Sequence, residues 1–318
     1  MLKYLKSRGV LLAICSKNNK EDVIEVFEKH PQFILKTSDF VIINANWEDK
    51  VSNIKNIAQQ LNLGLESFVF IDDSDFETTF VKRELPSVTV YKVPERLYDY
   101  PSLFRKILNL FNPHVYTSED QSRTMLYKIE QKRKESESNF NNIDEYLYSL
   151  GLKLYVSHNV LDHIQRVSQL TQKTNQFNLT TKRYTSNEIN SFISDPNTHV
   201  LDFRLKDNFG DYGIIGIVIF TCKDSNLFLD TLLLSCRSLG RGVEYEIINV
   251  LVLYAKKLNI KTIKAEYIKT PKNVQVQNFL IKSGMFENYS DKQRNNYSTK
   301  TSKIMNHKTN IKTIVNDI

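Results

Sequence analysis

The residues with the clearest chemical potential in this sequence lie directly after a short apolar run. Asp72 and Asp73 follow residues 68–71, which read FVFI. Such a run is typical of a buried parallel strand, and open α/β sheets bind their ligands at the carboxyl ends of strands. Two adjacent carboxylates repel each other unless a cation lies between them. The pair therefore predicts a cation site.

Two further strand ends carry residues of complementary chemistry. Ser16 follows the apolar run VLLAIC and precedes a predicted helix, where a hydroxyl and free backbone N–H groups can cradle a phosphate. Lys50 opens the helix that follows the run at 41–44. A hydroxyl, a lysine and paired acids, each at a strand end, form a constellation typical of phosphate and Mg²⁺. The alternative for Asp72 and Asp73 is a pair of solvated strand-end acids.

A second candidate site lies at a strand-to-helix turn in the second half of the chain. Arg237, Gly240 and Gly242 form the pattern R-x-x-G-x-G. Glycines let a backbone approach a ligand closely, and the N–H groups of the following helix face an anion. The pattern alone is weak, but it follows a predicted meander and precedes a helix, a strand and another helix.

The elements that must position these residues differ between the two halves. In the first half, strands are predicted at 10–15, 41–44, 67–71 and 87–92, and helices at 20–29, 50–61, 75–84 and 97–111. This alternation predicts a parallel sheet with crossover helices. In the second half, strands are predicted at 153–157, 198–206, 213–222, 227–235 and 262–268, and helices at 159–170, 243–258 and 273–283. Close succession of three long strands predicts an antiparallel meander.

The predicted architecture is therefore α/β, in four parts. They are an α/β domain over 1–112, a helical linker over 113–150, an α+β domain over 151–290 and a basic, flexible tail over 291–318. Within the linker we expect a solvent-exposed helix over 118–140 and a short helix over 142–150.

The order of the first-half residues resembles motifs two, three and four of the haloacid dehalogenase (HAD) phosphatase superfamily. RGVLLAICSKNN, FEKHP, NWEDK and FVFIDD are most similar to the FkbH-like proteins of polyketide pathways, and the resemblance covers residues 2–286. It implies that Ser16 binds phosphate, that Lys50 neutralises it, and that Asp72 and Asp73 hold Mg²⁺. The first half is thereby expected to be a HAD-like, Rossmann-type parallel sheet.

The sequence departs from the HAD pattern in two places. The family's nucleophile is the first Asp of a DxDxT motif on an upstream strand, and this sequence opens inside the helix after that strand. We therefore expect an incomplete sheet without phosphatase (hydrolase) activity. The residues SDFE also stand where the family has an Asn-Pro turn.

The end of the second half resembles the GNAT acyltransferase fold. NVQVQNFLIKSGM is similar to that family's N-x-x-A-x-x-F-Y-x-x-x-G-F ending, with Leu280 in place of the tyrosine. In FkbH-like proteins the two domains transfer a glyceryl group from 1,3-bisphosphoglycerate, through a cysteine thioester, to the phosphopantetheine thiol of an acyl carrier protein. The resemblance implies this activity here, with Arg237, Gly240 and Gly242 binding the pantetheine arm or CoA. Leu280 argues against ordinary acetyl transfer to an amine.

Two cysteines are candidates for the acyl-carrying thiol. Cys236 directly precedes the glycine turn, and Arg237 and the helix N-terminus would activate it. Cys15, next to Ser16, is the rival, and Cys222 is expected to be structural. The candidate catalytic residues are thus Cys236, Cys15 and Lys50. An odd number of cysteines indicates a reducing, cytoplasmic compartment.

The polar stretch KTNQFNLTTKRY, residues 173–184, also matches the FkbH-like pattern. Asn175, Gln176 and Asn178 are candidates for binding glyceryl hydroxyls through directional hydrogen bonds. The alternative is a loop that bonds to its own backbone. His158, His163 and His199 have no metal-ligand spacing, and we assign them no role.

Charge and hydropathy narrow the possible partners. Six of the lysines and arginines, against two aspartates, fall in residues 291–318, so over half of the net charge of +7 belongs to the tail and we do not expect a nucleic-acid partner. No run approaches the roughly 20 apolar residues that span a membrane, and we see no signal peptide. Two other functions stay open: an acyl-CoA-dependent acyltransferase with the first half as scaffold, and a non-enzymatic carrier-protein-binding module.

Overall fold

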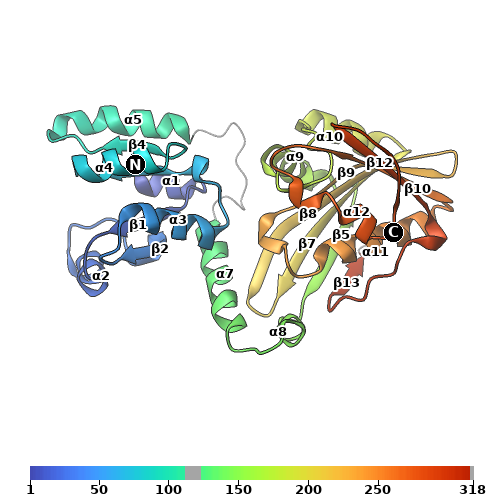
Figure 1. Ribbon diagram of the computed structural model, residues 1–318, viewed down its shortest axis with the longest axis horizontal. Helices are drawn as coiled ribbons and strands as arrows, with labels where there is room; N and C mark the ends of the chain where they lie inside the picture. The colour runs from blue at the N-terminus through green and yellow to red at the C-terminus, as the bar shows by residue number, and fades with distance from the viewer. Residues whose placement is uncertain (112–122, 316–318) are drawn as a thin grey trace. The chain divides into compact units, whose positions relative to one another are not determined.

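The computed structural model describes residues 1–111 and 123–315, which divide into two compact units, Met1–Lys134 and Glu135–Ile318 (Figure 1). Both units combine helices with β-sheet, so the α/β class predicted from the sequence is confirmed. Part of the predicted linker, residues 112–122, lies outside the described residues. Among the described helices, none has the length and apolar character needed to cross a membrane.

Unit 1 alternates strands with helices, as predicted. Its strands are β1 Leu12–Ser16, β2 Phe40–Ala45, β3 Val69–Asp72 and β4 Thr89–Lys92, and its helices are α1 Leu2–Ser7, α2 Lys20–Lys29, α3 Lys50–Leu61, α4 Asp75–Glu84 and α5 Tyr100–Leu110. Helix α7, Arg123–Glu137, begins in unit 1 and ends in unit 2. Helices α2, α3 and α4 begin and end at the predicted residues. Local capping explains α3, because Asp49 accepts a hydrogen bond from the Ser52 N–H at 2.8 Å and Asn62 ends the helix with a left-handed φ of 50°.

The buried face of α3 follows from its apolar spacing. Val51, Ile54, Ile57 and Leu61 recur every three to four residues and are at most 6% exposed. Val51 and Ile54 pack in one cluster with Phe70 of β3. Burying each such side chain contributes about 1.5–3 kcal/mol, so α3 holds its amino-terminal residue, Lys50, in a fixed place above the strand ends.

The four strands of unit 1 form two separate parallel pairs. β1 pairs with β2, and β3 pairs with β4. Within the described residues, neither β1 nor β3 pairs with a second strand. In the part of the chain that the structure describes, the two pairs are therefore separate sheets, with β1 and β3 not paired to each other.

Unit 2 is built on one large sheet. Its strands are β5 Lys153–His158, β6 Phe177–Asn178, β7 Thr198–Asp207, β8 Gly210–Lys223, β9 Asn226–Leu234, β10 Thr262–Ile268, β11 Phe286–Ser290, β12 Arg294–Lys300 and β13 Lys312–Val315, and its helices are α8 Ile143–Ser149, α9 Ile164–Lys173, α10 Ser186–Ser194, α11 Val243–Lys257 and α12 Phe279–Lys282. The strand order is β11-β12-β10-β9-β8-β7-β5-β13, with β6 paired to β9. The antiparallel β7-β8-β9 meander lies at its centre, as predicted.

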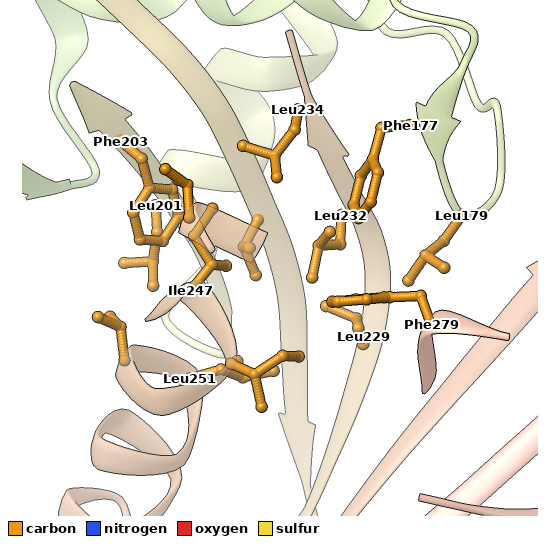
Figure 2. Packing of buried hydrophobic residues seen from close by; sticks show 14 of the residues in the cluster. Phe177, Leu179, Leu201, Phe203, Leu229, Leu232, Leu234, Ile247, Leu251 and Phe279 are labelled. Carbon is orange, nitrogen blue, oxygen red and sulfur yellow. The ribbon is translucent and has the colours of Figure 1, made fainter. Parts of the chain in front are cut away.

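Helices cover both faces of this sheet. On one face, α11 and α12 pack through Ile247, Leu251 and Phe279 against Leu232 and Leu234 of β9 (Figure 2). On the other face lie α9 and α10, whose buried residues Val167, Leu170 and Ile189 form a second cluster with strand residues. The strand residues of this cluster are Val200, Ile214, Ile217, Ile219 and Leu233. Because Leu233 and Leu234 belong to opposite clusters, the period-2 alternation of β9 places each on its own face. The sheet is therefore buried on both sides at β9, the strand that leads into the glycine turn.

Residues 291–315 contribute β12 and β13 to the large sheet, in contrast to the flexible tail that we expected over 291–318. β12 pairs with β10 along its whole length, and β13 extends the sheet beside β5. The buried carboxylate of Glu246 in α11 accepts hydrogen bonds from the hydroxyls of Thr309, at 2.6 Å, and Thr313. Polar composition suggested disorder, but every second residue of β12 from Asn295 to Thr299 is buried. That alternation is the signal of a half-buried strand.

Candidate functional site

The first candidate site lies where β2 and β3 of unit 1 end. Lys50, the first residue of α3, forms an ion pair with the carboxylate of Asp72, the last residue of β3. The two side chains are 12% and 7% exposed, and the other oxygen of Asp72 accepts the Ser74 N–H at 3.0 Å. Burial with two partners fixes this carboxylate in place. The structure therefore brings two of the predicted site residues, Lys50 and Asp72, into direct contact.

Ser16 and Asp73 occupy the same edge with greater exposure. Ser16 ends β1 and is half-buried, with its backbone carbonyl accepting the Asn46 N–H at 3.1 Å. Asp73 is exposed. Since β1 and β2 are parallel and Ser16 pairs with Ala45, the hydroxyl stands at the same edge as the start of α3.

Glu77 is an acid of this edge that the sequence did not single out. Its Oε1 lies 2.7 Å from Lys17 Nζ, so the residue after β1 contacts the first turn of α4, which follows β3. The residue is only 6% exposed, and Oε2 is buried without a hydrogen-bond partner. The pattern Ser74-x-x-Glu77 reads as a helix capping box, and Ser74 does accept the Glu77 N–H at 3.3 Å. The glutamate, however, turns toward the strand ends.

The acids of this edge fit Mg²⁺ by their chemistry. Mg²⁺ is usually held by one or two carboxylates together with waters and phosphate oxygens. Asp72 and Asp73 supply two such carboxylates, although Lys50 occupies one oxygen of Asp72. The described residues contain no group of three or more His, Cys, Asp or Glu side chains that could hold a metal ion by themselves.

The environment of Cys15 opposes nucleophilic chemistry. Its thiol is the donor toward the backbone carbonyl of Lys50, at 3.8 Å, inside unit 1. Burial raises the pKa of Cys15 to about 11, and the nearby Lys50 charge only partly offsets this. Because the thiolate is the nucleophile, Cys15 is a poor acyl acceptor at neutral pH.

The second candidate site is the turn between β9 and α11. Cys236 opens a single 3₁₀ turn, Cys236–Ser238, and is half-buried. Gly240 and Gly242 follow with φ of 78° and 76°, and Gly242 caps α11. A Cβ at either glycine would meet no atom within 4 Å. The turn therefore needs glycine for its left-handed backbone, and it leaves open space beside the helix N-terminus.

Two arginines of this turn, Arg237 and Arg241, contact other residues of the same turn. Arg241 donates to the backbone carbonyls of Arg237, at 2.9 Å, and Leu239, at 3.2 Å, and lies over the ring of Tyr212. Arg237 lies 3.4 Å from the hydroxyl of Ser235, which it reaches through Nε. The structure thus brings Cys236, Arg237, Gly240 and Gly242 together on one turn.

The three amides predicted to bind substrate have different surroundings. Asn178 is fully buried, and its side chain bonds to the backbone of Thr174, Thr180 and Thr181. This is the self-bonding loop that stood as the alternative. Asn175 is half-buried and accepts from Arg183, whereas Gln176 is exposed. Of the three, Gln176 has the side chain most accessible to a ligand.

Asp230 of β9 is a polar centre that the sequence did not reveal. It accepts from Tyr184, at 2.7 Å, and from Thr231, at 2.8 Å, and forms an ion pair with Lys182 at 2.5 Å. Burial, followed by the hydrogen bond to Asp230, raises the pKa of Tyr184 above its ordinary value. These contacts hold a loop in which Thr181 has a φ of 52°, a strained value for a β-branched residue. In the sequence, only the polar run at 180–184 indicated a polar cluster in this region.

The same loop fills the space where β9 and β10 diverge. β10 pairs with β9 only as far as Leu229. Beyond that point Leu179 donates to Leu232 of β9, at 3.1 Å, and accepts from Ile268 of β10, at 2.9 Å. Figure 2 shows Phe177 and Leu179 beside Leu232 and Phe279. A short strand therefore bridges both neighbours next to the glycine turn.

The histidines lie at the other end of the meander. His199 is the second residue of β7, whereas the glycine turn follows the end of β9, which runs in the same direction as β7. His158 and His199 contact each other at 3.0 Å, and burial lowers the pKa of both. His163 contacts Asp202 at 2.8 Å.

Comparison with known proteins finds two kinds of similar solved structure, a phosphatase domain and several acetyltransferases. No protein-family model matches the chain, and comparison with curated proteins finds no match. A phosphatase-domain fragment of a Bacteroides fragilis protein, solved in complex with Mg, is 44% identical over 35% of this chain and 29% of its own, with a TM-score of 0.33. This chain thus spans less than a third of that structure.

Acetyltransferase structures match a larger share of their own length. Mutant forms of the spermidine/spermine N-acetyltransferase SpeG from Vibrio cholerae are 14% identical over 48% of this chain and 95% of theirs, with a TM-score of 0.37. A probable acetyltransferase from Staphylococcus epidermidis is 12% identical over 46% and 99%, with the same TM-score.

Proposed function

We propose that this chain is an FkbH-like acyltransferase. In this proposal unit 1 binds the phosphate of an acyl phosphate such as 1,3-bisphosphoglycerate together with Mg²⁺, and unit 2 transfers the glyceryl group to the phosphopantetheine thiol of an acyl carrier protein in polyketide biosynthesis. The observation that carries it is the buried Lys50–Asp72 pair at the edge where Ser16 also stands. A lysine and a hydroxyl beside an acid suit a phosphate with a bound cation.

The chemistry assigns one role to each group. The Cys236 thiolate attacks the acyl carbonyl, the bond from the carbonyl carbon to the phosphate oxygen breaks, and phosphate leaves with the electron pair. Separately, Ser16 and Lys50 of unit 1 would bind the phosphate group of an acyl phosphate, and Mg²⁺ held by Asp72 and Asp73 would add positive charge at that half-site. The carrier thiolate then attacks the Cys236 thioester and releases the Cys236 thiolate.

The choice of Cys236 over Cys15 rests on their surroundings. Cys236 opens a turn with open space beside Gly240 and Gly242, where a pantetheine phosphate can reach the N–H groups of α11. Cys15 is half-buried like Cys236, but burial raises its pKa to about 11. For recognition of a glyceryl group, Gln176 and Asn175 are the proposed contacts, and Asn178 positions their loop.

The test is an acyl adduct measured by intact-protein mass spectrometry. The chain is incubated with a glyceryl thioester of N-acetylcysteamine, a preformed donor that bypasses the phosphate half-site. We expect an adduct on wild type, Cys15→Ala and Cys222→Ala, none on Cys236→Ala, and its transfer to carrier protein bearing phosphopantetheine but not to the apo carrier. An adduct that survives Cys236→Ala and is lost in Cys15→Ala refutes the assignment.

The same material separates the other two functions. An adduct formed as readily from an acyl-CoA, with the thiol of CoA competing against the carrier, would favour an acyl-CoA-dependent enzyme. Carrier binding without an adduct on any cysteine would favour a non-catalytic binding module.

A further inference from the structure

Two histidines of unit 2 meet where β5 ends and β7 begins. His158 is the last residue of β5 and His199 the second residue of β7, and His158 Nε2 lies 3.0 Å from His199 Nδ1. They are 41 positions apart in the sequence, so no local spacing revealed them. The antiparallel register brings them together, because His158 pairs with Leu201 and His199 lies two residues before it, on the same face of the sheet.

Aromatic neighbours hold both imidazole rings in place. His199 stacks on Phe220 of β8, with ring centroids 4.9 Å apart. His158 meets Tyr254 of α11 edge to face, with ring centroids 5.7 Å apart. Each ring is therefore oriented by its own aromatic contact as well as by the other histidine.

The backbone beside the pair is fixed as well. Asn159, whose φ is 52°, donates its N–H to the Val200 carbonyl at 2.9 Å, and its side-chain oxygen accepts the Val200 N–H at 2.9 Å. These bonds tie the residue after His158 to the residue after His199. The pair is thus preorganised, and little conformational entropy is lost when one ligand binds both rings.

Both imidazoles are in a state that suits metal binding. Each residue is half-buried, so a small ion can reach the pair. Burial lowers the pKa of His158 and of His199 from the ordinary value of 6.5, and both rings are therefore neutral at pH 7.5. Neutral imidazole is the commonest metal ligand in proteins and suits Zn, Cu and Ni.

The separation of the two nitrogens fits a single metal ion. With metal–nitrogen bonds of about 2.0–2.1 Å, two nitrogens 3.0 Å apart subtend an angle of roughly 90–100° at the ion. This is the angle between neighbouring ligands in square-planar or octahedral coordination. It is smaller than the tetrahedral angle of about 109° that structural Zn²⁺ adopts.

We propose that His158 Nε2 and His199 Nδ1 form a binding site for a divalent transition-metal ion of tetragonal geometry, Cu²⁺ or Ni²⁺, with water at the remaining positions. Rotation of the two rings replaces the contact between them by two metal–nitrogen bonds. The proton that lies between the rings moves to the outer nitrogen of the ring that carries it, so both rings stay neutral.

The surroundings define what kind of site this is. Among the described residues, no third His, Cys, Asp or Glu joins the pair in a metal-binding group. We therefore expect an exchangeable ion and not a closed structural centre. The ion would clamp the end of β5 to the start of β7, at the opposite end of the meander from the glycine turn, and should stabilise unit 2.

Metal titration of the full chain without a polyhistidine tag tests the proposal. Ni²⁺ is the probe, because Cu²⁺ can oxidise the three free cysteines. Isothermal titration calorimetry measures the Kd, and thermal unfolding measures the stabilisation. We expect the chain to bind Ni²⁺ about tenfold more tightly than Zn²⁺, and its Tm to rise with Ni²⁺ concentration.

Variants locate the ion. His158→Gln and His199→Gln each leave one imidazole, and each should weaken Ni²⁺ binding by about tenfold or more, because the second donor on the same scaffold is lost. His30→Gln, which removes an exposed histidine of unit 1, is the matched control and should leave the Kd unchanged. Circular dichroism checks that all three variants fold.

Electron paramagnetic resonance gives a readout that needs no variant. Wild type with substoichiometric Cu²⁺ should show hyperfine coupling to two imidazole nitrogens. Three outcomes would overturn the proposal: Ni²⁺ affinity unchanged in both His158→Gln and His199→Gln, tighter binding of Zn²⁺ than of Ni²⁺, or a Cu²⁺ spectrum without two coupled nitrogens. An equal loss of Ni²⁺ affinity in His30→Gln would likewise place the ion elsewhere on the chain.

Discussion

Lys17 Nζ lies 2.7 Å from Glu77 Oε1, and this pair connects the residue after β1 with the first turn of α4. Its partners have unequal surroundings, because the Lys17 side chain is 35% exposed and that of Glu77 only 8%. The buried carboxylate depends on the lysine, since the other oxygen of Glu77 has no partner. The contact therefore joins two strand pairs, β1-β2 and β3-β4, that share no backbone pairing in the described residues.

Removal of the lysine should consequently destabilise unit 1. Lys17→Met leaves a buried carboxylate without its ion pair, and we expect the Tm of unit 1 to fall by about 4 °C or more. Lys29→Met is the matched control, because it breaks an exposed pair with Glu25 on α2 and should hardly change the Tm. Thermal unfolding followed by circular dichroism measures both. Equal effects of the two substitutions would show that the Lys17–Glu77 contact is not structural.

The raised pKa of Cys15 predicts a pH-dependent reactivity. Its pKa of about 11 lies two units above the ordinary 9.0, so at pH 7.5 its thiolate fraction is about a hundredfold below that of a free cysteine. Alkylation by iodoacetamide should be correspondingly slow at pH 7.5 and should accelerate until the pH exceeds about 11, where unfolding has to be excluded by circular dichroism.

Lys50 tests the cause of this shift. Its charge favours the thiolate and partly opposes the effect of burial. Lys50→Met should therefore raise the pKa of Cys15 further and slow alkylation, while Lys55→Met, on the exposed face of the same helix, should not. Peptide mapping by mass spectrometry reports each cysteine separately. Alkylation of Cys15 at the rate of a free cysteine at pH 7.5 would contradict the buried environment.

The carboxyl-terminal strand should contribute measurably to the stability of unit 2. Glu246 is 9% exposed, and the Thr313 hydroxyl is one of its donors. Thr313→Val keeps the shape of β13 but removes that donor, and we expect the free energy of unfolding to fall by about 1–3 kcal/mol. Lys312→Ala, at the exposed neighbouring position, should change it by about 0.5 kcal/mol or less. Urea unfolding measures the free energy of unfolding of both variants. Equal values for the two would mean that β13 does not pack against α11.

The sequence predicted best where local signals agree with the fold. Helix α3 has a capping aspartate, regular apolar spacing and an asparagine at its end, so its limits could be read directly. The long strands of the meander were equally clear. In contrast, α10 was missed, although Thr185 and Glu188 form a capping box, because the surrounding stretch is polar.

The remaining errors concern structure set by distant residues. β6 has only two residues and exists because β9 and β10 diverge beside it. β13 is stabilised through Glu246, which lies far away in the sequence. Likewise, the buried carboxylate of Glu77 is paired with Lys17, which follows a different strand. The carboxylate of Asp230 is paired with Lys182 and Tyr184, which lie far from it in the sequence. Such partners are set by the tertiary fold and leave no periodic signal in the sequence.

The glycine turn offers the sharpest separation of backbone strain from charge. Gly242 has a φ of 76° and caps α11, and a Cβ there would meet no atom within 4 Å. Gly242→Ala therefore tests the left-handed backbone alone, whereas Gly242→Asp adds a negative charge where the proposed pantetheine phosphate would contact the helix N-terminus. We expect Gly242→Ala to lower stability by about 1 kcal/mol with only a small change in binding. Gly242→Asp should weaken binding of the phosphopantetheine-bearing carrier protein by about tenfold or more.

Isothermal titration calorimetry at two salt concentrations measures this weakening, because the effect of a charge shrinks at high salt whereas the effect of backbone strain does not. Gly240→Asp should behave similarly if the phosphate spans both glycines. If Gly242→Asp and Gly242→Ala bind the carrier equally well, the anion is not held at this turn, and the pantetheine arm must be sought elsewhere on unit 2.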